Sequence, residues 1–118
     1  MNRLFIAVAG VYGALGVALA AAATHTGGPL LAPASQMLLV HAPVLFALGL
    51  WMRPRGWAFQ SGGIVLMLGV TLFSGDLALR HLGQSLFPMA APSGGTLMMS
   101  GWLILAGAGL FGAHRDPH

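Results

Sequence analysis

The sequence contains no cysteine, no lysine and no glutamate among its 118 residues. Without cysteine there is no disulfide, no thiol nucleophile and no cysteine-ligated metal site. Charged residues make up only 6% of the chain, whereas soluble domains carry about a quarter. The chain also lacks a P-loop, a G-x-S-x-G motif and paired carboxylates, so the phosphate-binding and hydrolytic classes that depend on them are excluded. We therefore expect no enzyme.

Hydrophobic residues, by contrast, make up 57% of the chain and gather into four long runs. A helix of about 20 apolar residues rises about 30 Å, which is enough to cross the hydrocarbon core of a membrane. The sequence therefore predicts an all-α membrane protein, a four-transmembrane-helix bundle that forms one domain over residues 1–118. The four predicted helices are Leu4–Ala23, Ser35–Trp51, Trp57–Leu82 and Thr96–Ala113. Ser35 is the expected N-cap of the second helix, and Pro43 predicts a kink within it.

The arginines predict how the chain is oriented. With four spans, Arg3, Arg53, Arg55 and Arg115 fall on one side of the membrane and only Arg80 on the other. The positive-inside rule then puts both termini in the cytoplasm. We expect the arginines to serve orientation in a bacterial inner membrane rather than binding to nucleic acid. The first run also resembles a signal peptide, but it is longer than the usual apolar region, so we expect it to stay as a helix.

Small residues recur along the predicted helices at spacings that favour close helix contact. Gly10, Ala14 and Ala18 form a row at every fourth residue of the first helix. Such small-xxx-small rows let two membrane helices approach closely. The residues predicted to pack helices in this way are Gly10, Ala14, Ala18, Gly62, Gly69, Ala108 and Gly112.

The third helix holds the one carboxylate that would lie within the membrane, Asp76. Gly62 and Gly69 precede it at intervals of seven residues, and Arg80 follows one helical turn later, on the same face. A charged residue in a membrane is costly and faces a partner or a cavity. The predicted spans bring polar side chains to a similar depth, in the outer third of the bundle. This predicted polar cluster contains His25, His41, Asp76, Arg80 and Ser100.

Three interpretations of these polar residues stay open. Asp76 and Arg80 can form an intrahelical pair that holds the helices in register. Alternatively, Asp76 and His41 form a pocket for a proton or a ligand in a small proton-coupled transporter or ligand-binding protein. A third interpretation is a haem- or metal-binding bundle that uses His25 and His41, with His81 as a further ligand. The histidine spacings match no compact ligand motif, so we expect no metal and no cofactor.

Four blocks of sequence, in order along the chain, resemble a known family. These blocks are GALGVALAAAATH (Gly13–His25), HAPVLFALGL (His41–Leu50), LFSGDLAL (Leu72–Leu79) and PSGGTLMMSGWLILA (Pro92–Ala106). Together they are similar to the small inner-membrane proteins typified by YgdD, which have relatives in a TMEM group of animals. The resemblance implies a four-helix inner-membrane protein without an established activity. It makes His25 and His41 the matching histidines, whereas Asp76 stands where the family has a small residue.

Taken together, the sequence predicts a non-catalytic integral membrane protein. We expect it to be a structural or accessory component of a larger membrane complex. Its expected partners are membrane lipid and either other membrane proteins or further copies of itself.

Overall fold

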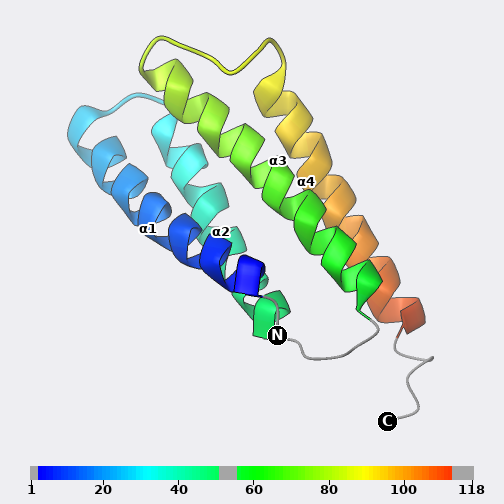
Figure 1. Ribbon diagram of the computed structural model, residues 1–118. Coiled ribbons are helices and arrows are strands. Elements are labelled where there is room, and N and C mark those ends of the chain that lie inside the picture. Colours follow the sequence, from blue (N-terminus) through cyan, green and yellow to red (C-terminus); the bar gives the residue numbers. More distant parts are fainter. Residues whose placement is uncertain (1–2, 51–55, 113–118) are drawn as a thin grey trace.

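The computed structural model describes residues 3–50 and 56–112, and these residues form an entirely helical structure. They include four long helices, which lie side by side (Figure 1). A short π-helical segment, η1, continues the last of them. The elements are α1 (Arg3–Thr26), α2 (Leu31–Leu50), α3 (Trp57–His81), α4 (Ala90–Gly107) and η1 (Ala108–Gly112).

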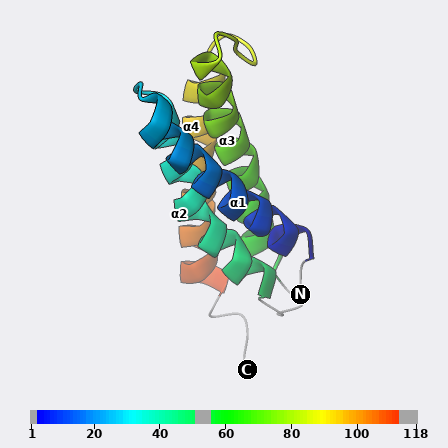
Figure 2. The same ribbon diagram turned by 90° about the vertical axis from the view of Figure 1, so that its left-hand side faces the viewer.

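The helices form two hairpins. α1 packs against α2, α3 packs against α4, and the two hairpins meet mainly through α2 and α3. The α1–α2 and α3–α4 connections lie at the same end of the bundle in both Figure 1 and Figure 2. We call this end the loop end. The start of α1 and the end of α4 lie at the opposite end.

Two helices begin earlier than the sequence predicted. α2 begins at Leu31 rather than at Ser35, and α4 begins at Ala90 rather than at Thr96. In both cases a proline, Pro33 or Pro92, lies in the first turn of the helix. A proline is tolerated there because the first backbone N–H groups of a helix have no partner within it. α2 also runs through Pro43 without interruption.

The described helices are all long and apolar enough to span a membrane. α1 ends at Thr26 and α3 ends at His81, each within three residues of the predicted end. Arg53, Arg55 and Arg115, on which the predicted orientation depends, lie outside the described residues. Within the described residues the structure is therefore all-helical, with four membrane-compatible helices.

Glycines allow α3 and α4 to approach until their backbones touch. A methyl group on Gly69 would lie 2.7 Å from both the Gly94 oxygen and the Met98 nitrogen. A methyl group on Gly94 would lie 2.5 Å from the Phe73 nitrogen. Gly62 on α3 and Gly101 on α4 continue the contact against leucine side chains of the opposite helix. The glycines repeat every seven residues on each helix, which keeps them on the shared face.

The predicted row of small residues on α1 does not face the other helices of the bundle. Gly10, Ala14 and Ala18 are exposed, and a methyl group on Gly10 would meet nothing within 4 Å. The row that faces the bundle contains Phe5, Ala9, Tyr12 and Gly16. Because α1 is apolar on every face, its hydrophobic pattern does not distinguish the inward face from the outward one. Ala108 is buried at the start of η1, and Gly112 is its last residue.

Candidate functional site

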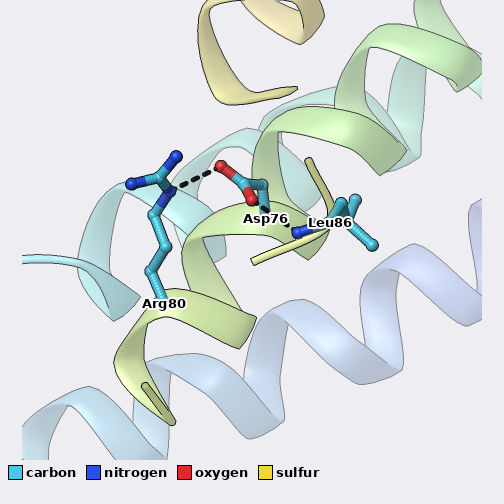
Figure 3. Close-up of polar contacts among 3 residues, drawn as sticks. All are labelled: Asp76, Arg80 and Leu86. Atoms are coloured by element: carbon cyan, nitrogen blue, oxygen red, sulfur yellow. Dashed lines mark hydrogen bonds and ion pairs between the residues drawn. The ribbon is translucent and has the colours of Figure 1, made fainter. Parts of the chain in front are cut away.

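The buried carboxylate of Asp76 lies near the loop end of α3 and has partners on both oxygens. Its side chain has no exposed area, whereas that of Arg80 is 42% exposed. The Arg80 Nε atom donates a hydrogen bond of 2.7 Å to Oδ2, and the Leu86 backbone N–H donates one of 3.0 Å to Oδ1 (Figure 3). The carboxylate therefore ties the last turn of α3 to the loop that leads into α4.

Asp76 also acts on the start of α4. Met89, the N-cap residue, provides no side-chain hydrogen bond to the helix and has a left-handed conformation with φ 68°. The Ala91 backbone N–H, in the first turn, is a further donor near the Asp76 carboxylate. The amino-terminal end of a helix carries a partial positive charge that favours a nearby anion. Asp76 therefore lies beside the amino-terminal turn of α4, whose N-cap residue provides no side-chain hydrogen bond.

The seven-residue glycine spacing explains why Asp76 reaches α4. Gly62, Gly69 and Asp76 lie at successive seven-residue steps of α3, and the two glycines press against α4. Asp76 continues the same stripe to the point where α4 begins. The close approach that the glycines permit therefore brings the carboxylate to the amino-terminal turn of the neighbouring helix.

His41 forms a separate polar contact, between α2 and α4. Its Nδ1 atom lies 2.8 Å from the Met37 carbonyl oxygen, one turn earlier in α2. Its Nε2 atom lies 3.1 Å from the Trp102 Nε1 atom of α4. A carbonyl only accepts and an indole N–H only donates, so the two contacts require a neutral imidazole with its proton on Nδ1. Both ring nitrogens are therefore engaged within the protein.

The predicted cluster residues are not gathered at one depth. His41 lies ten residues after the start of α2, and Ser100 lies ten residues after the start of α4, so each is about 15 Å along its helix from the loop end. Asp76 lies five residues from the end of α3, which corresponds to about 7.5 Å. The earlier starts of α2 and α4 produce this difference. Asp76 and Arg80 are in contact, whereas His41 pairs with Trp102.

The other predicted site residues have local or exposed positions. Ser100 donates to the Thr96 carbonyl oxygen of its own helix. His25 is exposed at the end of α1. The Nε2 atom of His81 lies 3.4 Å from the Thr26 hydroxyl, which links the ends of α3 and α1. Among residues 3–50 and 56–112, no three histidine, aspartate or glutamate side chains form a group that could hold a metal ion.

Three hydroxyl groups join helices in a way that the sequence did not reveal. The Tyr12 hydroxyl donates to the Met67 carbonyl oxygen at 2.7 Å and lies 2.8 Å from the Thr71 hydroxyl. Ser35 donates to the Gly16 carbonyl oxygen at 2.7 Å, and Ser74 donates to the Ala34 carbonyl oxygen at 2.8 Å. The sequence does contain one signal for the first contact, since Tyr12 is the chain's single tyrosine and lies in an otherwise apolar helix.

Polar groups inside the described bundle are satisfied by one another. Every buried side-chain nitrogen or oxygen atom of the described residues has a hydrogen-bond partner. The geometry therefore defines a helical membrane-compatible bundle whose interior polar groups link its helices and loops.

Comparison with protein families gives one match. The family described as a protein of unknown function (DUF423) matches residues 9–95, which is well over half of the chain. The chain belongs to this family. The match extends from α1 to the first turns of α4 and includes His41, Asp76 and Arg80. Neither the curated proteins nor the solved structures contain a match to the chain.

Proposed function

We propose that the protein is a non-catalytic component of the bacterial inner membrane, where it serves as a structural or accessory subunit of a larger complex. The observation that carries this proposal is the internal pairing of its buried polar groups. Both oxygens of Asp76 and both ring nitrogens of His41 have partners within the chain. A protein that handles protons or ligands needs a base or a donor that its substrate can reach. These two side chains instead support the connections between helices.

The outer surface of α1 supports a role in assembly. Gly10, Ala14 and Ala18 lie on that surface and leave it without bulky side chains along one row. Rows of small residues let a second helix approach closely in a membrane. On this proposal, α2, α3, α4 and the inward face of α1 hold the bundle together, and the outward face of α1 meets a partner.

The proposal extends to orientation, with both termini in the cytoplasm. The absence of cysteine from the chain makes this testable with single introduced thiols. Arg3→Cys places a thiol at the start of α1, and Ser85→Cys places one in the exposed α3–α4 loop. A membrane-impermeant maleimide added to intact spheroplasts should label only Ser85→Cys. Labelling of Arg3→Cys alone would show that the orientation is the opposite of the one proposed.

Purification in a gentle detergent, followed by native mass spectrometry and an absorption spectrum, tests the accessory role. We expect a defined larger assembly without pigment. Replacing Gly10 and Ala14 by leucine should release the partner, whereas enlarging Leu15 to phenylalanine, at an exposed position on another face of α1, should not. Isolation of the wild-type protein as a colourless monomer would contradict the accessory role, and a coloured preparation would favour the haem interpretation.

A further inference from the structure

We infer that Arg80 is a binding site for the phosphodiester group of an anionic phospholipid, at the loop end of the bundle. A guanidinium group carries five N–H donors. In the described residues only the Nε donor of Arg80 has a partner, the Asp76 carboxylate. Figure 3 shows the two terminal nitrogens of Arg80 on the far side of the guanidinium group from its aliphatic chain. The four donors on these nitrogens match the two free oxygens of a phosphodiester.

The position of Arg80 matches the depth of lipid headgroups. Arg80 is one residue from the end of α3, so it lies about 1.5 Å along the axis from the last helical residue. This step rests on the proposed membrane placement, in which the end of α3 reaches the membrane surface. Leu82, two residues later, is 74% exposed, and Phe87 and Met89 in the same loop are also exposed. These apolar side chains fit the acyl region next to the headgroup.

The carboxylate of Asp76 orients Arg80 without fully cancelling its charge. Asp76 is shared between Arg80 and the Leu86 N–H, which bind different oxygens of the carboxylate. Arg80 is therefore held in one orientation before a lipid arrives, which lowers the entropy cost of binding. Among the described residues, Arg80 is the one Lys or Arg side chain at the loop end, since Arg3 lies at the opposite end.

The experiment is a lipid titration of the purified full-length protein in detergent, followed by native mass spectrometry. The probes are phosphatidylglycerol and phosphatidylcholine with identical acyl chains. We expect one phosphatidylglycerol molecule to bind about tenfold more tightly than phosphatidylcholine, because the choline headgroup already carries its own cation. Arg80→Gln should remove this preference. Arg3→Gln, which changes the other described arginine, should leave the preference intact.

A second variant controls for misfolding, which Arg80→Gln can cause because it leaves the buried Asp76 without its arginine partner. Asp76→Asn/Arg80→Gln replaces the ion pair by two neutral amides, and circular dichroism reports whether its helices persist. This variant should bind both lipids equally. Arg80→Lys should retain part of the preference, because it keeps the charge but loses the planar fork of donors.

Several results would overturn the inference. An unchanged phosphatidylglycerol preference in Arg80→Gln or in the folded double variant would show that Arg80 does not bind the lipid. Displacement of phosphatidylglycerol by millimolar inorganic phosphate would assign the site to a free phosphate instead. Equal binding of both lipids by the wild-type protein would leave Arg80 as an ordinary interfacial arginine. None of these results depends on whether a protein partner exists, so the accessory role is tested separately by the purification above.

Discussion

The two hairpins of the bundle are held together by different means. In the α3–α4 hairpin, Gly69 and Gly94 bring backbone against backbone, and Asp76 fastens the loop that leads into α4. In the α1–α2 hairpin, Gly16 faces the side chain of Leu39, and the Ser35 hydroxyl bonds to the Gly16 carbonyl oxygen. A backbone contact cannot adjust, whereas a leucine side chain can change its rotamer. The comparison suggests that α3–α4 is the rigid hairpin and α1–α2 the adaptable one.

This difference fits the roles proposed for the two hairpins. The rigid hairpin holds Asp76 and Arg80 in a fixed relation, which a preorganised lipid site requires. The adaptable hairpin presents the open row of Gly10, Ala14 and Ala18, where a partner helix would have to be accommodated. Substitutions that disrupt each hairpin separately test whether α3–α4 is rigid and α1–α2 adaptable.

The largest effect is expected from Gly94→Ala in the rigid hairpin. The new methyl group would lie 2.5 Å from the Phe73 nitrogen and 2.6 Å from the Gly69 oxygen, so two helix backbones must separate. Overpacking of this kind costs about 3 kcal/mol of unfolding free energy. The matched control is Gly95→Ala, where a methyl group meets nothing within 4 Å. Denaturant titration in mixed micelles should show a large loss of unfolding free energy for Gly94→Ala and no loss for Gly95→Ala.

Asp76→Asn should have the second-largest effect. The amide keeps the shape of the carboxylate but loses its charge, so the bonds to Arg80 and to the Leu86 N–H weaken. Because Arg80 is 42% exposed, its guanidinium can recover hydration, which limits the loss. Hydrogen exchange at the Leu86 amide should accelerate markedly, with a fall in unfolding temperature. Protection of that amide equal to wild type would show that Asp76 does not fasten the loop.

A double-mutant cycle sharpens this result. If Asp76 and Arg80 act as a pair, Asp76→Asn/Arg80→Gln should be less destabilised than the sum of the two single variants. Strict additivity would contradict the coupling.

Much of the fold could be predicted from the sequence because the membrane constrains it strongly. Four apolar runs of sufficient length leave few alternatives to four helices. The pairing of Asp76 with Arg80 was also predictable, since a spacing of four residues places both on one helix face. Gly62 and Gly69, which mark the stripe that leads to Asp76, could be read from their seven-residue spacing.

The remaining contacts had no comparable signal in the sequence. The Leu86 N–H is a backbone donor, and any residue at that position would supply it. Trp102 is one apolar residue among many, so its pairing with His41 depends on how α4 is rotated. The start of α4 was misplaced because Pro92 is typical of loops as well as of first helical turns. The inward face of α1 could not be chosen because the helix is apolar all round.

Gly16→Ala should have a moderate effect in the adaptable hairpin. The new methyl group would lie 2.6 Å from Leu39 Cγ and 3.3 Å from the Leu39 nitrogen, so the exposed Leu39 side chain must move while the two backbones need to separate by only a few tenths of an ångström. We expect a loss of about 1 kcal/mol in unfolding free energy, well below that for Gly94→Ala. Gly13→Ala on the same helix, where nothing lies within 4 Å, is the control. Equal losses for Gly16→Ala and Gly94→Ala would remove the distinction between the hairpins.

The smallest effects are expected from single hydroxyl groups that bond across helices. Ser74→Ala removes the bond from α3 to the Ala34 carbonyl oxygen, which joins the two hairpins. Interhelical polar contacts in membranes contribute about 0.6 kcal/mol on average, and the Ala34 carbonyl belongs to a helix that already provides it with a backbone partner. Ser100→Ala is the control, because Ser100 bonds only within its own helix. In the same titration, the unfolding free energy of Ser74→Ala should therefore be slightly lower than that of wild type, and that of Ser100→Ala should equal it. A loss for Ser74→Ala as large as that for Gly94→Ala would mean that the join between the hairpins, rather than the rigid α3–α4 contact, limits the stability of the bundle.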